Sequence, residues 1–187
     1  MPLGTGPKVV SPEPVDPAVA RMIRLDYLLG VAWRIEPVDV AMITSIEYGQ
    51  MKGFSGSFHT GMLLSPDRNI VRVVDVPIGL GAVYRHRFGG RPLYASVGLT
   101  AGILVHRAGT DLGVIRRVDP DLRAPLRLAW TVERVGMSLA LVPAFSFRER
   151  TYERRGAEVW KHHSVRVGLV FGLHWDLVVG RANRRRP

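Results

Sequence analysis

The residues best suited to catalysis are three neighbours near the C-terminal end of the chain. His162, His163 and Ser164 could supply a general base and a nucleophile, which is the chemistry of a hydrolase. Such a site also needs an orienting carboxylate and an oxyanion hole, and adjacency in sequence provides neither. We therefore expect this segment to be the beginning of a strand at the rim of a loop, and we predict no catalytic residues.

Three further histidines could hold a metal ion or relay a proton. His59, His106 and His174 fall on the same side of the strands that we predict below. Their spacing matches no known ligand pattern, so we interpret them as interior side chains with hydrogen-bond partners. The chain has no cysteine, which excludes disulfides and thiolate chemistry. We predict no metal site and no cofactor.

The chain is strongly basic. It carries 26 Lys and Arg against 16 Asp and Glu, a formal net charge of +10 over 187 residues. A basic protein can bind nucleic acid or an acidic membrane surface. The basic residues are scattered, apart from the run Arg184 to Arg186, and no recognition helix or stacking platform accompanies them. We therefore predict no nucleic-acid partner.

The elements that position these residues are strands. Apolar and polar residues alternate with period two, the pattern of a strand with two unlike faces. The clearest segment runs from residue 23 to 35, where Ile23, Leu25, Tyr27 and Leu29 share one face and Arg24 and Asp26 lie on the other. The pattern recurs over residues 40–49, 54–64, 74–85, 93–106, 122–133, 137–149 and 164–175. The sequence thus predicts an all-β fold of about eight strands.

The two faces differ in size and polarity. The apolar face carries bulky side chains throughout, whereas the other mixes Gly, Ser and Thr with charges. The interior of an eight-stranded barrel has little room, so it suits the small and charged set better. This favours a closed antiparallel up-and-down barrel of the transmembrane type, with its apolar face toward lipid. Eight charged residues are predicted to form a network in the lumen: Arg24, Asp26, Glu47, Asp75, Arg85, Arg127, Glu133 and Arg166.

Five aromatic residues lie near the ends of the predicted strands on the apolar face. They are Trp33, Tyr48, Tyr84, Trp130 and Trp175. Rings with a polar tip suit the boundary between membrane and water, so we predict that these five residues lie at that interface.

The connections alternate between two ends of the predicted barrel. One end carries residues 36–39, 65–69, 107–121 and 150–162, two of which are long and charged. The other end carries the short turns 49–53, 87–92 and 135–136, together with both termini. Outer-membrane barrels place short turns and termini in the periplasm and longer loops outside. Loop length therefore supports the same fold independently.

Over residues 21–175 the chain resembles the small outer-membrane β-barrel superfamily of Gram-negative bacteria. Its last predicted strand matches the spacing of that superfamily's assembly signal at Arg166, Gly168, Phe171 and Leu173, although the chain continues past the strand instead of ending on an aromatic residue. The resemblance implies a monomer in the bacterial outer membrane that contacts the lipid bilayer and lipopolysaccharide and is inserted by the outer-membrane assembly machinery. We expect a Pro-rich linker over residues 1–20, the barrel over 21–180 and a basic tail over 181–187, with no signal peptide in the given chain.

The sequence leaves several functions open. We expect a non-enzymatic barrel with a structural or surface-interaction role. The alternatives are a narrow passive channel of the same fold and a soluble barrel that binds an apolar ligand. An outer-membrane lipid hydrolase, which the resemblance also allows, would require His163 or Ser164 for turnover.

Overall fold

The computed structural model describes residues 21–34, 38–65, 72–89, 91–110, 113–154 and 157–179. The predicted linker and basic tail lie outside these residues. The described part of the chain consists of strands joined by turns. The strands are β1 (Arg21–Trp33), β2 (Val38–Gln50), β3 (Gly53–Leu64), β4 (Arg72–Arg87), β5 (Leu93–Thr110), β6 (Gly113–Arg123), β7 (Leu126–Val132), β8 (Val135–Ser146), β9 (Arg150–Arg154), β10 (Ala157–His162) and β11 (Val165–Val179).

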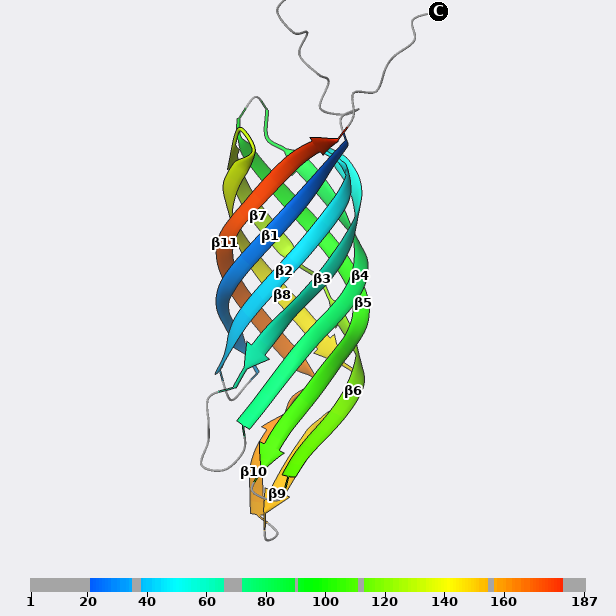
Figure 1. The fold of residues 1–187 in the computed structure, drawn as a ribbon, viewed down its shortest axis with the longest axis vertical. Coiled ribbons are helices and arrows are strands. Elements are labelled where there is room, and N and C mark those ends of the chain that lie inside the picture. The colour runs from blue at the N-terminus through cyan, green and yellow to red at the C-terminus, as the bar shows by residue number, and fades with distance from the viewer. Residues whose placement is uncertain are drawn as a thin grey trace, which may run out of the picture.

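The long strands form a closed antiparallel barrel (Figure 1). From β1 to β6 each strand pairs with the next, β8 pairs with β6, β7 and β11, and β11 returns to pair with β1 over the full length of β1, from Arg21 opposite Val179 to Trp33 opposite Val167. The first and last strands therefore begin and end at the same end of the barrel, which we call the turn end. The opposite end is the loop end. The predicted up-and-down barrel is confirmed.

Strands β6 and β7 occupy a single position in the barrel wall. Both pair with β5 in one unbroken register, with Arg123 opposite Thr100 and Leu126 opposite Val97. The interruption lies at Ala124 and Pro125, where proline has no N–H to donate to a ladder. Counting β6 and β7 as one strand, and leaving aside the separate β9–β10 hairpin, the wall has the eight strands that the sequence predicted.

The segments 107–121 and 150–162, which we predicted as connections at the loop end, consist mostly of strand. The first is occupied by the end of β5 and most of β6, which pair from Thr100 opposite Arg123 to Thr110 opposite Gly113. The second contains the β9–β10 hairpin, which Figure 1 shows beyond the loop end of the barrel. In these segments the alternating positions carry charged residues on both faces or charged residues opposite apolar ones. The regular apolar alternation that predicts a strand therefore stops before the strand itself ends.

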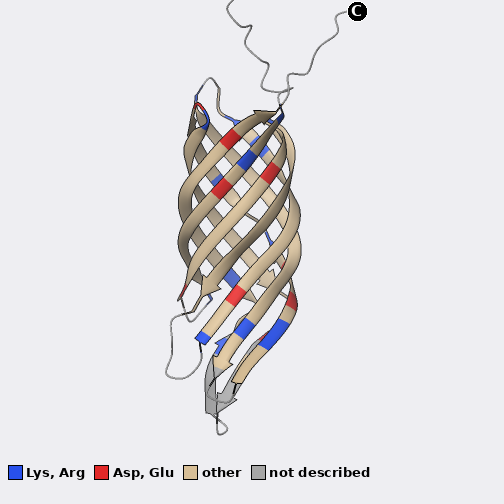
Figure 2. Ribbon diagram, viewed as in Figure 1, with Lys and Arg blue, Asp and Glu red and all other residues tan. Residues whose placement is uncertain are grey.

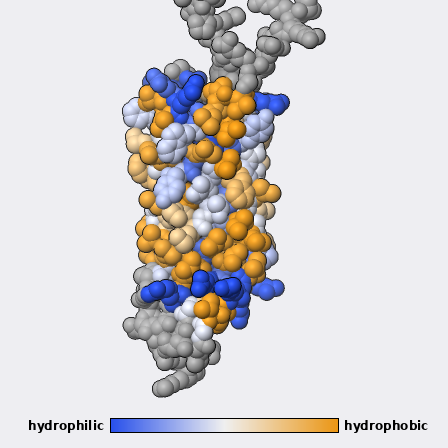
Figure 3. Space-filling model, in the orientation of Figure 1, coloured by the Kyte–Doolittle hydropathy of each residue, from blue (hydrophilic) through white to orange (hydrophobic). Residues whose placement is uncertain are grey.

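The outer and inner faces of the wall have opposite character. Along β5, Leu99 is 58% exposed on the outside whereas the next residue, Thr100, is 1% exposed on the inside. The exposed large hydrophobic residues come from all eight wall strands, and Figure 3 shows the strongly hydrophilic colour concentrated toward the two ends of the barrel. No helix long and apolar enough to cross a membrane occurs among the described residues.

Glycine on the inner face allows the narrow barrel to close. Gly79 of β4 and Gly102 of β5 lie directly opposite each other. A Cβ added to Gly102 would stand 2.0 Å from the carbonyl oxygen of Ile78 and 2.5 Å from the Cα of Gly79. Because both neighbours are backbone atoms, this part of the wall cannot accept a larger residue without moving a strand.

Candidate functional site

The barrel interior is the most unusual part of the molecule, because it holds charged side chains in two groups. The turn-end network comprises Arg24, Asp26, Glu47, Arg85, Arg127 and Asp176. The loop-end network comprises Arg34, Asp39, Asp75, His106, Asp121, Arg123 and Arg166. Figure 2 shows charged positions near both ends of the wall with a largely uncharged zone between them.

Arg127 is the centre of the turn-end network. Its Nη1 donates to Asp26 Oδ2 at 2.9 Å and to Glu47 Oε1 at 2.8 Å, so one guanidinium bridges carboxylates from two strands. Arg85 of β4 pairs with the other oxygen of Glu47. Asp26 also accepts a hydrogen bond from Ser45 at 2.8 Å. Each buried charge in this group therefore has an opposite partner, which offsets the cost of removing it from water.

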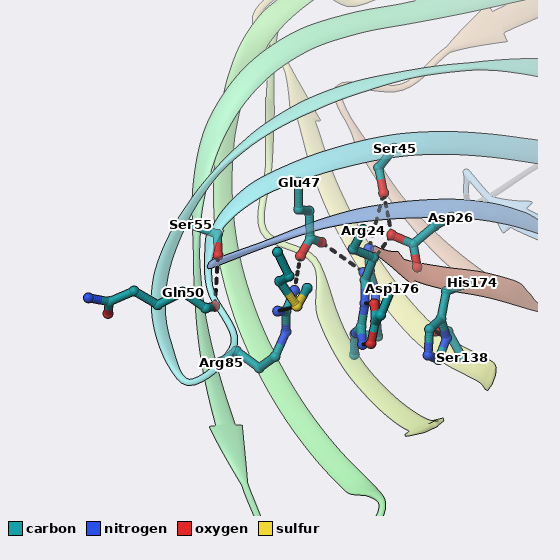
Figure 4. Close-up of polar contacts among 12 residues, drawn as sticks. Arg24, Asp26, Ser45, Glu47, Gln50, Ser55, Arg85, Ser138, His174 and Asp176 are labelled. Carbon is teal, nitrogen blue, oxygen red and sulfur yellow. Dashed lines mark hydrogen bonds and ion pairs between the residues drawn. The ribbon is translucent and has the colours of Figure 1, made fainter. Parts of the chain in front are cut away.

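A second pair joins the two strands that close the barrel. Arg24 of β1 donates through Nε and Nη2 to the two carboxylate oxygens of Asp176 on β11, both at 2.6 Å, in bidentate geometry (Figure 4). Next to it, the two ring nitrogens of His174 lie 2.7 Å from Thr131 Oγ1 and 2.8 Å from Ser138 Oγ. The Arg24–Asp176 pair therefore joins β1 to β11 where the ring closes, and His174 joins β11 to β7 and β8.

The loop-end network has carboxylates at its centres. Asp75 pairs with Arg34 through one oxygen and with His106 through the other. Asp121 likewise pairs with Arg166 at 2.6 Å and with Arg123 at 2.8 Å. Both carboxylates are at most 2% exposed.

Arg34 has a second carboxylate partner, Asp39, which lies near the beginning of β2. The Nε of Arg34 lies 2.6 Å from Asp39 Oδ2, and Ser65 donates to Asp39 Oδ1 at 2.5 Å. Arg34 is therefore held between two buried carboxylates, Asp39 and Asp75.

An apolar layer separates the two networks. Its buried members are Leu28, Ala32, Ala41, Leu63, Ala140 and Val170. Beside it, His59, Thr100, Arg123 of the loop-end network and Arg127 of the turn-end network border one small enclosed space, so the two networks approach each other there. The volume open to the centre of a water-sized sphere is about 10 Å³, enough for roughly one water molecule. The interior is thus filled with side chains at this level.

The structure places seven of the eight predicted lumen residues inside the barrel. Each is at most 7% exposed, and they divide between the networks: Arg24, Asp26, Glu47, Arg85 and Arg127 at the turn end, Asp75 and Arg166 at the loop end. The placement of Glu133 is wrong. It is exposed in the two-residue turn between Val132 and Val135, with a φ of 57°, so the strand ends before alternation would bring it inside.

Sequence reasoning missed six buried charges: Arg34, Asp39, Asp119, Asp121, Arg123 and Asp176. Asp39, Asp119 and Asp121 lay in segments that we expected to be loops, and Asp176 followed the expected end of the last strand. Arg34 and Arg123 were on the inner face of the predicted pattern but were not selected. Extending the alternation by one residue at the strand ends would have found Asp39, Asp121 and Asp176, and an extension by three residues would have found Asp119.

The five predicted interface aromatics all lie on the outer face, between 41% and 51% exposed. Tyr48, Tyr84, Trp130 and Trp175 lie toward the turn end of their strands, while Trp33 is the last residue of β1 at the loop end. Phe54 adds to the turn-end group, with its ring 5.1 Å from that of Tyr84. Toward the loop end Phe145 and Phe147 join Trp33, with their rings 5.1 Å apart, so among the described side chains both ends of the wall carry exposed aromatic rings.

The candidate catalytic and metal residues do not assemble into a site. The three interior histidines lie apart: His106 belongs to the loop-end network, His174 contacts Thr131 and Ser138 beside the turn-end network, and His59 borders the small enclosed space. Within the described residues no group of three or more His, Cys, Asp or Glu side chains could hold a metal ion. His163 and Ser164 are half-buried just before β11, and the side chain of His162 lies outside the described residues.

The fold is similar to solved barrels from three bacteria. Neisserial surface protein A (NspA) gives a TM-score of 0.60 at 13% identity, over 84% of this chain and 97% of that one. The N-terminal β-barrel domain of OprF from Pseudomonas aeruginosa gives 0.56 at 11% identity, over 85% and 98%. Ail, the attachment invasion locus protein of Yersinia pestis, solved with the heparin analogue sucrose octasulfate, gives 0.51 at 10% identity, over 84% and 99%.

No protein-family model matches the sequence, and a comparison with curated proteins found no match. The likeness to the solved barrels is therefore one of fold. All three are small outer-membrane barrels, so this likeness confirms the predicted resemblance and the eight-stranded architecture.

Proposed function

We propose that this protein is a non-enzymatic β-barrel of the bacterial outer membrane with a structural or surface-interaction role. The observation that carries the proposal is the inversion of the wall: large apolar side chains cover the outside, and buried ion pairs fill the inside. In water this arrangement would expose hydrophobic residues on every strand, whereas in a bilayer it places them against lipid.

The orientation of the barrel in the membrane follows from the different connections at its two ends. The turn end has the short connections Gln50 to Gly53 and Val132 to Val135. The loop end has the extended β5–β6 pair and the β9–β10 hairpin. In outer-membrane barrels short turns face the periplasm, so the hairpins at the loop end would face outward and provide the surface for interactions.

A passive channel of the same fold is disfavoured by the filled interior. Two networks of paired charges and an apolar layer lie across the lumen, and the enclosed space between them holds about one water molecule. A soluble barrel that binds an apolar ligand would need an apolar cavity, and the described interior is instead charged.

The remaining expectations form part of the same proposal. The barrel would be a monomer, because the ring closes on itself through β1 and β11 and the closed part of the wall offers no strand edge to a second copy. Its lipid partners would be the bilayer and lipopolysaccharide. The outer-membrane assembly machinery would insert it, with Arg166, Gly168, Phe171 and Leu173 on the last strand as the recognition signal.

Refolding tests the proposal. The denatured chain is diluted into buffer and into detergent micelles, and each sample is run on a gel with and without boiling. We expect a compact, β-rich form whose mobility changes on boiling, and only in detergent. A stable folded monomer in plain buffer would contradict the membrane location and return attention to a soluble protein.

A further inference from the structure

Two arginines that belong to different networks border one small space inside the barrel. Arg123 of β6 and Arg127 of β7 lie on either side of Pro125, in the same part of the wall. Together with His59 of β3 and Thr100 of β5 they form the polar lining of the enclosed space described above. Each of these four polar side chains is at most 7% exposed. We call this space and its four polar side chains the central site.

The central site contains polar atoms that form no hydrogen bond with the rest of the described protein. They are Arg123 Nη2, Arg127 Nε, Thr100 Oγ1 and His59 Nε2. A guanidinium nitrogen can only donate a hydrogen bond, so two cations present N–H groups for which the described residues supply no acceptor. A buried donor without an acceptor destabilises a fold. The central site is therefore suited to a ligand that accepts hydrogen bonds.

The carboxylates that pair with these arginines are engaged outside the central site. Arg127 contacts both of its carboxylate partners through Nη1, and its Nε takes no part in those ion pairs. Asp121 contacts Arg123 through one oxygen and Arg166 through the other, so one carboxylate is shared by two guanidinium groups. Because a buried cation is stabilised by an opposite charge, the group that best fits between Arg123 and Arg127 is an anion.

The size of the central site limits this anion to a single atom. The volume open to the centre of a water-sized sphere is about 10 Å³, which excludes a carboxylate or a phosphate group. A halide ion is only a little larger than a water molecule. A Cβ added to Gly79 would stand 3.0 Å from Arg123 Nη2, so the glycine keeps one side of the site open. The remaining lining is mostly apolar and comes from Leu28, Ile43, Ala140 and Val142.

We propose that the central site binds one halide ion, chloride under ordinary conditions, between the guanidinium groups of Arg123 and Arg127. The ion accepts N–H groups from both arginines and the hydroxyl hydrogen of Thr100. His59 adds a fourth donor when its Nε2 carries the proton. The ion thereby connects the loop-end network to the turn-end network beside the apolar layer. The inference goes beyond the proposed function, because the site requires only the closed barrel and no external partner.

The first test compares two sodium salts. The full chain is refolded in detergent micelles, and the midpoint of thermal unfolding is measured by gel mobility in sodium chloride and in sodium gluconate at equal concentrations. Both salts screen charges equally, but gluconate is too large for the site. A ligand that binds only the folded state stabilises it in proportion to the occupancy of its site. We expect a midpoint several degrees higher in chloride, with a shift that saturates. Equal midpoints at all concentrations would overturn the proposal.

Thr100→Val tests the location, because it removes one donor with little change of shape. The matched control is Thr44→Val, the same change at a half-buried threonine on the outer face of β2. In gluconate, T100V should unfold at the wild-type temperature or above it, because it removes a buried hydroxyl that lacks a partner among the described residues. In chloride it should unfold below wild type, having lost more than half of the chloride shift, whereas T44V keeps that shift. A full chloride shift in T100V would overturn the site.

Anomalous diffraction locates the ion directly. Crystals of the refolded protein grown in sodium bromide should show an anomalous peak between Arg123 and Arg127, within contact distance of the Thr100 hydroxyl. Density at that point without an anomalous signal would identify a water molecule and overturn the proposal. Neither that result nor equal midpoints in the two salts would affect the membrane proposal, which depends on the outer face of the wall.

Discussion

The two charged networks inside the barrel differ in how their ion pairs are linked. At the turn end Arg127 bridges Asp26 and Glu47, and Glu47 also pairs with Arg85. At the loop end Asp121 is the common partner of Arg123 and Arg166, Asp75 pairs with two basic side chains, and Arg34 links Asp75 to Asp39. The difference matters because removing one buried partner leaves the others uncompensated. The residue whose loss costs most should therefore be an arginine at one end and an aspartate at the other.

The largest expected effect is that of Arg127→Met. This change keeps an unbranched apolar stem but removes the guanidinium group, which leaves Asp26 without its ion-pair partner and Glu47 with only Arg85. Loss of one member of a buried ion-pair group costs about 3–5 kcal/mol. The free energy of unfolding, measured by urea titration in detergent micelles, should fall by that amount. Arg134→Met, at an exposed arginine in the β7–β8 turn, is the control and should change it little.

Asp121→Asn should have the next largest effect. The amide keeps the shape of the side chain but loses the charge that pairs with Arg123 and Arg166. Hydrogen bonds to charged groups contribute about 1.5–3 kcal/mol, and we expect a loss in that range by the same titration. A loss equal to that of Arg127→Met would mean that the two centres do not differ as the geometry implies.

The separation of the networks can be measured by combining variants from each. Arg85 and Arg34 belong to different networks, with the apolar layer between them. The effects of Arg85→Met and Arg34→Met on the free energy of unfolding should add to within about 0.5 kcal/mol. A coupling energy well above that figure would show that the interior acts as one network.

The smallest expected effect is at Glu133, which belongs to neither network. Glu133→Ala should change the free energy of unfolding by less than about 0.5 kcal/mol, as is usual for exposed positions. Glu133→Gly should raise it, by up to about 1–2 kcal/mol, because glycine adopts the positive φ of this turn without strain. A large loss in the alanine variant would instead indicate an interior role for this carboxylate.

The same comparison shows what the sequence could predict. Regular alternation places Arg24, Asp26, Glu47, Arg85 and Arg127 on the inner face, and this is most of the turn-end network. The loop-end network lies where strands run past their apolar stretches, so Asp39 and Asp121 were assigned to loops. Alternation predicts the face on which a residue lies only as far as the strand continues. Glu133 lies in the turn after the strand, so its predicted position in the lumen is wrong.

The pairing itself could not be predicted from the alternation. Arg24 and Asp176 are 152 residues apart and meet because the barrel closes on β1 and β11. Which charges meet across the lumen depends on strand register and tilt around the whole ring. The pattern of one strand contains neither quantity.

The central claim is that the apolar face of the wall contacts lipid and the charged face is inside. The chain has no cysteine, so single cysteines can be introduced from Val97 to Ile103 on β5 and spin-labelled in vesicles. Collision with oxygen, which concentrates in the hydrocarbon, should rise and fall with period two. The account predicts maxima at Val97, Leu99, Ala101 and Ile103 and minima at the residues between them. Maxima at Gly98, Thr100 and Gly102, or no alternation, would contradict it.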